Sequence, residues 1–392
     1  MDKKRLAIIS DCVHFKTPDG RVATENHIFL KQMEALSAHF SHTIICCPFE
    51  DFSGDKIYTG YCADIEFYPT PNVGGDAISD KFAIVKTIPV WWKIFNKLYK
   101  QSDYFYLRFP NNLNIPGFFY FNFKSKPLFA SYTGTWKNYT GEPATYRFQK
   151  WLLRKYFKGP VWIYAEVKDK EKNLYEGFSP SYNLQIWEEE SRHVNQKITR
   201  FKNGIPENPV FISVGALVAY KNQQFILEAF LLLKKSNFKF KLFIIGDGPL
   251  KSTYEDFIQE NQLSDCIVLT GKKTYQEMRF FYRQADFLLQ APVTEGFGKT
   301  PIEGFFHGVI PFLSNTLYGK KMTGIEKRGF VFSTEKPIKL ANIIKEKILD
   351  NNLLASMIEI GRQYAKEFTL ENWVNDYMKK LHIYFENQAF RK

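Results

Sequence analysis

Residues 287–304 read FLLQAPVTEGFGKTPIEG, in which a short apolar run leads through two glycines and a proline into a segment of helical period. The apolar run predicts a strand that ends near Gln290, and Pro301 suits the first turn of the following helix. Gly296 and Gly298 free the backbone of the connecting turn to approach a ligand. A strand, turn and helix of this kind is the repeating unit of a doubly wound α/β domain.

The rest of the chain repeats this alternation, which predicts parallel sheets covered by helices on both faces. Strands of the first half are expected at 6–9, 43–46, 65–68, 104–107, 127–130 and 161–164, with a helix over 25–40. Strands of the second half are expected at 210–214, 242–245, 266–269 and 287–289, separated by helices near 222–236, 249–261 and 274–284. The pattern predicts two doubly wound domains that face each other across a cleft.

A candidate linker separates the two sets of strands. The polar segment 188–202, followed by Asn203-Gly204-Ile205-Pro206, has the charge, glycine and proline typical of a linker. We therefore expect an N-terminal domain over 1–204 and a C-terminal domain over 205–370. The length of 392 residues fits two domains of ordinary size.

The composition excludes several classes of protein. The chain has 53 Lys and Arg against 41 Asp and Glu, and this net charge of +12 points to an anionic partner. An aromatic content of 17% is unlike that of a disordered chain. No apolar stretch reaches the roughly 20 residues that cross a bilayer, and the five cysteines lack a metal-binding spacing. We therefore expect a cytoplasmic protein with reduced thiols.

Two carboxylates flank the glycine turn of the opening stretch, Glu295 before it and Glu303 just inside the helix. Amides at a helix N-terminus form an anion site, and ionised carboxylates can grip paired hydroxyls. The pattern suits a ligand with phosphate in the middle and a polyol at each end, which is the layout of a nucleotide sugar. The alternative is that Glu295 is an ordinary loop residue and Glu303 a solvated helix residue.

Two further turns follow strands of the same half. The turn at 215–222 contains Lys221, and a lysine in this place can neutralise a diphosphate as a point charge. The sequence IGDGP at 245–249 is a glycine turn after the next strand. Ligands of doubly wound sheets bind outside the carboxyl ends of the strands, so we expect all three turns to contribute to one site.

The run SVG-x-L-x3-K, then IGDGP, then E-G-F-G-x4-E-G resembles the GT-B glycosyltransferases of family 4, a large group of retaining nucleotide-sugar enzymes. The resemblance is strong over about residues 205–335 and only topological over the N-terminal half. It implies two Rossmann-like domains, with the nucleotide sugar bound mainly to the second. It also implies no catalytic metal and no cofactor, because the UDP- or GDP-sugar is a substrate.

The resemblance also implies roles for individual residues. Lys221 would contact the donor diphosphate and Glu295 would bind the donor sugar near the reacting carbon, which makes these two the expected catalytic residues. Glu303 would hold the ribose. The other residues expected to bind the donor are Gly215, Gly246, Lys272, Phe297, Gly298, Lys299 and Thr300, with Lys272 in a loop near the base.

Two positions depart from the family pattern. Ala216 stands where the family commonly has an arginine on the diphosphate, and Thr133 stands where it often has a histidine beside the reacting centre. The loss of an arginine–phosphate contact should weaken donor binding by about 1.5–3 kcal/mol unless another cation substitutes. The candidates for this substitution are Lys299, Lys320 and Arg108.

The N-terminal half is expected to hold the acceptor. The residues assigned to the acceptor side are Asp11, Gly20, Arg108 and Thr133, with Arg21 and Glu25 nearby. Segments 81–100 and 146–158 combine basic with large apolar residues, which is typical of helices that lie on an anionic membrane. Alternatively, their aromatic side chains pack on the sheet and their lysines face water. The last stretch, 371–392, packs back on the N-terminal domain if the resemblance holds, or is an ordinary helix of the C-terminal domain.

These observations together predict a function. We expect a retaining, metal-independent hexosyltransferase that acts on a glycan or lipid-linked acceptor in bacterial surface polysaccharide synthesis, in the cytoplasm or peripherally at the inner membrane face. The alternative is a catalytically weak GT-B subunit that binds a nucleotide sugar or a partner enzyme. Nucleic acid is not an expected partner, because no such motif occurs. Residues 1–195 carry 25 basic and 21 acidic residues and the rest carries 28 and 20, so the larger excess lies on the donor side.

Overall fold

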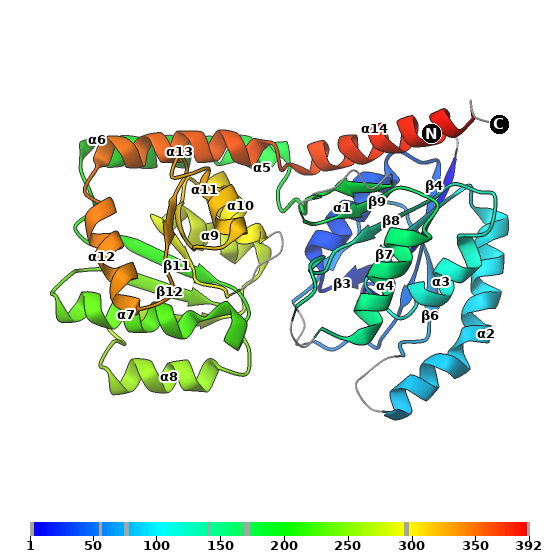
Figure 1. Ribbon diagram of the computed structural model, residues 1–392, viewed down its shortest axis with the longest axis horizontal. Coiled ribbons are helices and arrows are strands. Elements are labelled where there is room, and N and C mark those ends of the chain that lie inside the picture. Colours follow the sequence, from blue (N-terminus) through cyan, green and yellow to red (C-terminus); the bar gives the residue numbers. More distant parts are fainter. Residues whose placement is uncertain are drawn as a thin grey trace. The chain divides into compact units, whose positions relative to one another are not determined.

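The computed structural model describes residues 4–54, 57–73, 78–139, 142–165, 167, 173–293 and 298–389. The chain divides into two compact units (Figure 1). Unit 1 comprises Met1–Pro180 and Leu370–Lys392, and unit 2 comprises Ser181–Thr369. Each unit is built on a parallel sheet.

The described residues of unit 1 form a seven-stranded sheet in the order β10-β9-β8-β7-β1-β4-β6, with every neighbouring pair parallel. Its strands are β1 (Arg5–Ile9), β4 (His42–Pro48), β6 (Glu66–Thr70), β7 (Tyr104–Phe109), β8 (Leu128–Tyr132), β9 (Val161–Ile163) and β10 (Leu174–Glu176). A small antiparallel sheet contains β2 (Phe15–Lys16), β3 (Val22–Thr24) and β5 (Thr59–Gly60). The chain order of the main sheet reverses between β1 and β7.

Both faces of this sheet are covered, because alternate residues of β1 enter different cores. Leu6 and Ile8 pack with α1 (His27–Ser37) and α14 (Leu370–Ala389). Ala7 and Ile9 pack with α2 (Ile78–Gln101), α3 (Asn114–Phe121) and α4 (Ala144–Lys155). Strands buried on both faces read as continuous apolar runs, which explains why the sequence pattern located them. None of the helices in the described residues is both long and apolar enough to cross a membrane.

In unit 2 the described residues form a six-stranded parallel sheet in the order β13-β12-β11-β14-β15-β16. Its strands are β11 (Val210–Val214), β12 (Lys241–Ile245), β13 (Ile267–Gly271), β14 (Phe287–Gln290), β15 (Ile310–Ser314) and β16 (Phe330–Phe332). Its helices are α5 (Leu184–Glu189), α6 (Ser191–Asn203), α7 (Gln223–Lys235), α8 (Lys251–Glu260), α9 (Tyr275–Gln284), α10 (Lys299–Phe306), α11 (Leu317–Thr323), α12 (Pro337–Lys347) and α13 (Asn351–Lys366). This strand order is that of a Rossmann fold, and unit 1 repeats it with one further strand. The predicted pair of Rossmann-like α/β domains is confirmed.

The division between the units differs from the boundary expected near residue 205. The polar segment 188–202 is not a linker but forms the end of α5 and nearly all of α6, which lies beside α13 in unit 2 (Figure 1). Helix α6 buries only Val194, Lys197 and Phe201, so its apolar stripe is too narrow to stand out from the charged residues around it.

Helix α14 belongs to unit 1, although it follows unit 2 in the sequence. Trp373, Tyr377 and Leu381 are buried in the core that contains α1. The Tyr377 ring stacks on Trp162 of β9 with the ring centroids 4.0 Å apart. The aromatic stripe of this helix therefore closes one face of the unit 1 sheet.

Candidate functional site

The turns that the sequence predicts to bind a ligand lie at the carboxyl ends of β11, β12, β13 and β14. The chain order of the sheet reverses between β11 and β14, and such a switch point is where open α/β sheets bind their ligands. The Val293 amide after β14 donates to the Tyr220 carbonyl after β11 at 2.9 Å. The lysine turn and the start of the glycine turn are therefore neighbours, although Tyr220 and Val293 are 73 residues apart in the chain.

The turns after β11 and β12 touch through their backbones. Gly246 has φ +147°, and a Cβ atom at this position would lie only 1.9 Å from the Gly215 carbonyl oxygen. The Leu217 amide donates to the Asp247 carbonyl at 2.9 Å, which holds the turns together. Gly246 is therefore required for the close approach of the two turns.

Lys221 lies at the switch point, at the end of a 3-10 turn (Ala219–Lys221) that precedes α7. A Cβ atom on Gly215 would be 3.9 Å from Cδ and Cε of Lys221, so the stem of the lysine runs beside this glycine. The ammonium lies 5.4 Å from the centroid of the Tyr220 ring. The lysine is half-buried, and its charge is placed where an anionic ligand of the β11 turn would bind.

The N-terminus of α10 provides backbone donors next to this lysine turn. The cap residue is Gly298, which has no side chain of its own to cap the amides of the first turn. First-turn amides lack partners within their helix, which makes them an anion site. Tyr318 of α11 donates to the Gly298 carbonyl, and a Cβ atom on Gly298 would lie 2.6 Å from the Tyr318 ring. The tyrosine thus fixes the start of α10, where Lys299 and Thr300 are half-buried.

Glu303 is the fifth of the eight residues of α10, and hydroxyl groups hold its carboxylate. Ser181 Oγ donates to Oε1 at 2.5 Å, and the Tyr282 hydroxyl donates to Oε2 at 2.9 Å. Glu303 is half-buried, whereas Tyr282 is fully buried on α9. The carboxylate therefore has a defined orientation, unlike that of a solvated helix residue.

A charged cluster that the sequence did not predict lies next to Glu303, because one of its members, His307, contacts the Glu303 carbonyl. Arg279 and Arg283 of α9 each donate to Glu190 Oε1, at 2.6 and 2.8 Å, and His307 Nε2 is 3.9 Å from the same oxygen. Burial opposes the charge of Glu190, but the hydrogen bonds from Arg283 and Arg279 and the neighbouring His307 lower its pKa to about 2. Burial lowers the pKa of His307 to about 4. The only sequence signal was the spacing of the two arginines on one helix face, and nothing in it pointed to Glu190.

Of the other residues predicted at the donor site, some lie in the described turns and some lie outside the described residues. Lys272 is exposed directly after β13, and Ala216 is exposed in the turn after β11. Glu295 and Phe297 lie outside the described residues. Lys299 begins α10 and Lys320 is exposed on α11, so two of the three candidate substitutes for the missing arginine belong to elements near the glycine turn, whereas Arg108 is on β7 of unit 1.

On the acceptor side, Asp11 and Asn112 line a cavity of about 200 Å³ at the switch point of unit 1, between β1 and β7. The other residues that line it are Pro48, Thr70, Pro71, Asn72, Val73, Trp91 and Leu113. The Asn111 side-chain amide donates to Asp11 Oδ1 at 3.4 Å. Asp11 therefore lies at the edge of the sheet where the sequence analysis placed it.

The remaining acceptor-side predictions do not line this cavity. Arg108 donates to Gln32 Oε1 at 2.8 Å and lies over the Phe29 ring, so α1 of unit 1 holds its guanidinium. The Thr133 hydroxyl and amide both donate to the Phe109 carbonyl, at 3.2 and 2.8 Å. Gly20, with φ +82°, lies in the turn between β2 and β3.

Comparison with known proteins locates the sequence similarity in unit 2. Residues 195–364 match the family model "Glycosyl transferases group 1". An uncharacterised glycosyltransferase of Methanocaldococcus jannaschii is 32% identical over 162 residues, 41% of this chain and 44% of that protein. Alpha-monoglucosyldiacylglycerol synthase of Streptococcus pneumoniae is 32% identical over 142 residues, 34% of this chain and 32% of that protein. The chain thus matches less than half the length of these curated relatives.

Solved structures match both units. A glycosyltransferase from Rickettsia africae superposes with a TM-score of 0.69 at 13% identity, over 99% of this chain and 100% of that chain. Anabaena HepE in complex with UDP and glucose gives a TM-score of 0.67 at 12% identity, over 97% and 99% of the two chains. The chain has the GT-B fold. At these identities the likeness establishes the fold alone.

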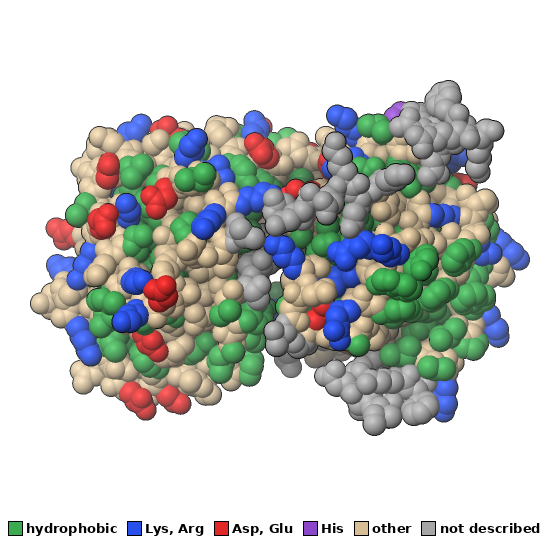
Figure 2. Space-filling model, viewed as in Figure 1, with side chains coloured by type: hydrophobic (Ala, Val, Ile, Leu, Met, Phe, Trp, Pro, Cys, Tyr) green, Lys and Arg blue, Asp and Glu red, His purple; other side chains and the backbone are tan. Residues whose placement is uncertain are grey.

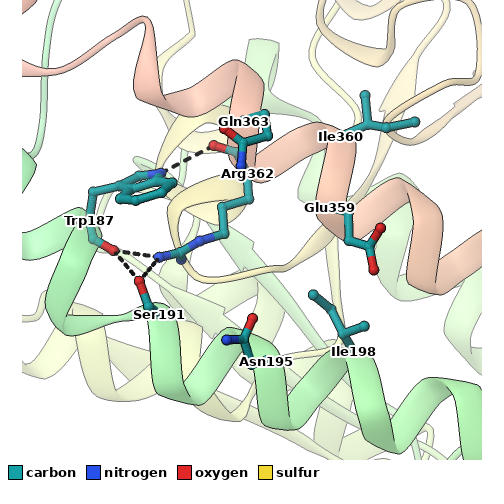
Figure 3. A pocket seen from close by; sticks show the side chains of 8 residues that line it. All are labelled: Trp187, Ser191, Asn195, Ile198, Glu359, Ile360, Arg362 and Gln363. Atoms are coloured by element: carbon teal, nitrogen blue, oxygen red, sulfur yellow. Dashed lines mark hydrogen bonds between the residues drawn. The ribbon is translucent and has the colours of Figure 1, made fainter.

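A larger cavity of the GT-B chain, of about 630 Å³, lies elsewhere in unit 2, between α5, α6 and α13 (Figure 3). It is lined by Trp187, Ser191, Asn195, Ile198, Glu359, Ile360, Arg362 and Gln363. The Arg362 guanidinium donates to the Trp187 carbonyl, to Ser191 Oγ at 2.7 Å and to the Phe306 carbonyl at 2.9 Å. Arg362 thus joins α13 to α5 and to the end of α10, which supports the helix that carries Glu303.

Exposed aromatic side chains gather on α3 and α4 of the GT-B chain, beside basic residues (Figure 2). On α4 and just after it, Phe148, Trp151 and Tyr156 are 39, 46 and 55% exposed. The Trp151 ring stacks on Phe148 with the ring centroids 5.8 Å apart, and it contacts Tyr156 edge-on with the centroids 4.9 Å apart. Lys150 on the opposite face is buried and pairs with Glu142. In segment 146–158, Phe148, Trp151 and Tyr156 therefore face outward, unlike the packing alternative, whereas Phe157 is buried and Lys155 faces water as that alternative expects. In segment 81–100 the packing alternative is borne out, because Trp91 and Phe95 are buried and Lys93 and Lys97 are exposed.

Proposed function

We propose that this chain is a retaining glycosyltransferase that takes the sugar of a UDP- or GDP-sugar bound to unit 2 and transfers it to an acceptor bound to unit 1. One observation carries the proposal: Lys221, the N-terminus of α10 and the oriented carboxylate of Glu303 lie on elements that meet at one switch point. A cation and helix amides suit a diphosphate, and a carboxylate suits a ribose diol. The match of residues 195–364 to glycosyl transferases group 1 supports this donor.

In the proposed reaction, the bond between the anomeric carbon and the diphosphate oxygen breaks and the electron pair leaves with the diphosphate. The acceptor hydroxyl attacks the anomeric carbon from the face of the leaving group, and its proton passes to the departing phosphate oxygen. Lys221 and the first-turn amides of α10 stabilise the charge that develops on the diphosphate, which is the main catalytic contribution. Because protein groups supply this positive charge, the reaction as proposed needs no metal. Glu295 binds the donor sugar beside the reacting carbon.

The cavity of unit 1 is the proposed site of the acceptor. Asp11, Asn72 and Asn112 offer a carboxylate and two amides, and the almost fully buried Trp91 closes the inner wall of the cavity. Polar groups of this kind bind sugar hydroxyls. The name of the pneumococcal relative, a glucosyldiacylglycerol synthase, supports a lipid or lipid-linked glycan as the wider acceptor class.

We also propose that the aromatic patch of Phe148, Trp151 and Tyr156 contacts an anionic membrane, with Arg147, Arg154 and Lys155 next to the headgroups. Replacing Phe148 and Trp151 by serine should lower binding to phosphatidylglycerol vesicles in a sedimentation assay at least fivefold. The matched control is Phe280→Ser, which removes an exposed aromatic residue of unit 2. Equal binding of all three proteins would contradict this role of the patch.

A second candidate function is a catalytically weak GT-B subunit that binds a nucleotide sugar or a partner enzyme. Two observations favour it: Ala216 brings no cation to the turn after β11, and the hydroxyl and amide protons of Thr133 both go to the Phe109 carbonyl. Nucleotide release from a panel of UDP- and GDP-sugars, with glycan and lipid acceptors supplied, separates the two functions. The enzyme should turn over, and Glu295→Ala should abolish the turnover. Binding without turnover would favour the weak subunit.

A further inference from the structure

Glu303 and the two hydroxyl groups that hold it define a feature that goes beyond donor binding in general. Each carboxylate oxygen accepts one protein hydrogen bond, Oε1 from Ser181 and Oε2 from Tyr282. These donors come from the first residue of unit 2 and from α9, whereas Glu303 is on α10. Three segments of the chain therefore converge on one carboxylate.

Counting hydrogen-bond acceptors shows what this carboxylate can still bind. An ionised carboxylate has two oxygens with about four acceptor positions in total. Ser181 and Tyr282 occupy one position on each oxygen. One position on each oxygen is left, and two adjacent acceptors match the two neighbouring hydroxyls of a ribose. A 2′-deoxyribose would leave one of the two positions unused.

The hydroxyl of Tyr282 is itself held in place. Its ring stacks on His307 with the centroids 5.2 Å apart, and His307 Nδ1 lies 2.8 Å from the Glu303 carbonyl oxygen. Lys197 donates to the carbonyls of Tyr282 and His307, at 3.3 and 3.0 Å, and so links the ends of α9 and α10. Burial and then the charge of Glu303 raise the pKa of Tyr282 well above its usual value, so the hydroxyl keeps the proton that it donates.

Ser181 is also fixed. The Tyr275 hydroxyl donates to the Ser181 carbonyl at 3.1 Å, which ties this residue to the first turn of α9. Tyr182, the next residue, is buried and packs against Phe306 and His307. Neither hydroxyl that holds Glu303 is thus on a loosely packed side chain.

We propose that Ser181 and Tyr282 are positioning residues that orient Glu303 toward a ribose diol and so make the site discriminate ribonucleotides from 2′-deoxyribonucleotides. This inference rests on the proposed function, because it takes the ligand of Glu303 to be the ribose of the donor. A site built to bond a hydroxyl rejects the analogue that lacks it, since its polar groups are then left without a partner. A carboxylate held in one orientation discriminates more strongly than a mobile one, because a mobile carboxylate could rotate toward solvent and replace the missing hydroxyl with water.

The experiment measures the Kd of UDP, 2′-deoxy-UDP, GDP and 2′-deoxy-GDP by calorimetry with the full chain. The readout is the ratio of the Kd of the deoxynucleotide to that of the ribonucleotide, because general damage to unit 2 weakens both and leaves the ratio unchanged. The test variants are Tyr282→Phe, Ser181→Ala and Glu303→Gln. Ser181→Thr keeps a hydroxyl, and Tyr254→Phe removes the hydroxyl of another buried tyrosine of unit 2. Melting curves confirm that each variant is folded.

We expect the wild type to prefer the ribonucleotide at least tenfold. The ratio should fall to about 1 in Glu303→Gln and at least threefold in both Tyr282→Phe and Ser181→Ala, while Ser181→Thr and Tyr254→Phe keep the wild-type ratio. Wild-type ratios in both Tyr282→Phe and Ser181→Ala would overturn the inference and leave the proposed function standing. A wild-type ratio in Glu303→Gln, or no binding of any nucleotide to the wild type, would instead count against the proposed function.

Discussion

The two sheets have the same strand order around their switch points, yet they present their functional residues in different ways. In unit 2, turns after three neighbouring strands of the sheet, β12, β11 and β14, bring Lys221, Gly246 and the start of α10 together, and each turn has a recognisable local pattern. In unit 1, the cavity is lined from the last residues of β4 and β6, from the turns after β1, β6 and β7, and from Trp91 inside α2. A diphosphate can be bound by backbone amides and one cation, which a local motif encodes. An acceptor surface assembled from separate side chains has no such motif.

The first test of this contrast introduces a side chain into a closely packed turn of unit 2. Gly246→Val places a side chain where a Cβ atom would already lie 1.9 Å from a backbone oxygen. We expect the free energy of unfolding in urea to fall by about 4 kcal/mol or more, because the turns after β11 and β12 must separate. The control is Gly20→Ala in unit 1, where φ is +82° but no atom lies within 4 Å. That change should cost only about 1 kcal/mol. Equal losses would show that the turns of unit 2 are not closely packed.

The second prediction concerns the dependence of stability on pH. Each unit buries one histidine, His14 in unit 1 and His307 in unit 2. Burial lowers the pKa of each from 6.5 to about 4. Between these values the unfolded chain binds more protons than the folded one, so stability falls as the pH drops from 6.5 to 4. A shift of this size corresponds to about 3 kcal/mol for each histidine. In His307→Gln, the melting temperature of unit 2 should lose most of this dependence on pH.

His14→Gln is the matched control for unit 1. His14 bonds through both ring nitrogens, to the Cys12 carbonyl at 2.7 Å and to the Tyr61 hydroxyl at 2.9 Å. In unit 2, the depressed pKa of Glu190 adds a second loss of stability below about pH 4.5. Calorimetric melting from pH 7.5 to 4 should therefore show both transitions shifting down, and a pH-independent melting profile would be inconsistent with the two buried histidines.

A smaller effect is expected from the acceptor cavity of unit 1. Asp11→Asn should lower kcat/KM for the acceptor about tenfold, because a charged hydrogen bond to a sugar hydroxyl becomes a neutral one. The Kd of the nucleotide should not change. Asp19→Asn serves as the control, since Asp19 is exposed and pairs with Arg21 in the β2–β3 turn. If Asp11→Asn weakened the nucleotide instead, the assignment of the acceptor to unit 1 would be incorrect.

How far the sequence could predict the fold depended on the patterning of each element. Strands such as β1, β4, β11 and β12 are buried on both faces and were located within a residue or two. The short strands β10 and β16 and the proline-containing β15 gave too weak a signal. Helix α6 was taken for a linker because only three of its 13 residues are buried.

The residues of the candidate site were also predictable only where the local sequence has a clear pattern. The turns of unit 2 were predictable because each is a contiguous motif in which glycine, lysine or glutamate follows a strand. The partners of Glu303 were not, because Ser181 is 122 residues away in the sequence and Tyr282 is 21 residues away on another helix. The ion pair between Glu190 and Arg279 was not predictable either, because the two residues are 89 positions apart and belong to different segments. Contacts between distant segments are set by tertiary packing, and a single sequence carries no trace of them.

The central claim is that the turns of unit 2 bind a nucleoside diphosphate through Lys221. Its most direct test is a calorimetric titration of the wild type and of Lys221→Ala with UDP and with GDP. We predict that one of the two binds the wild type and that Lys221→Ala weakens this binding at least tenfold, because a charged phosphate contact contributes about 1.5–3 kcal/mol. The absence of binding to the wild type, or equal affinity in Lys221→Ala, would contradict the account.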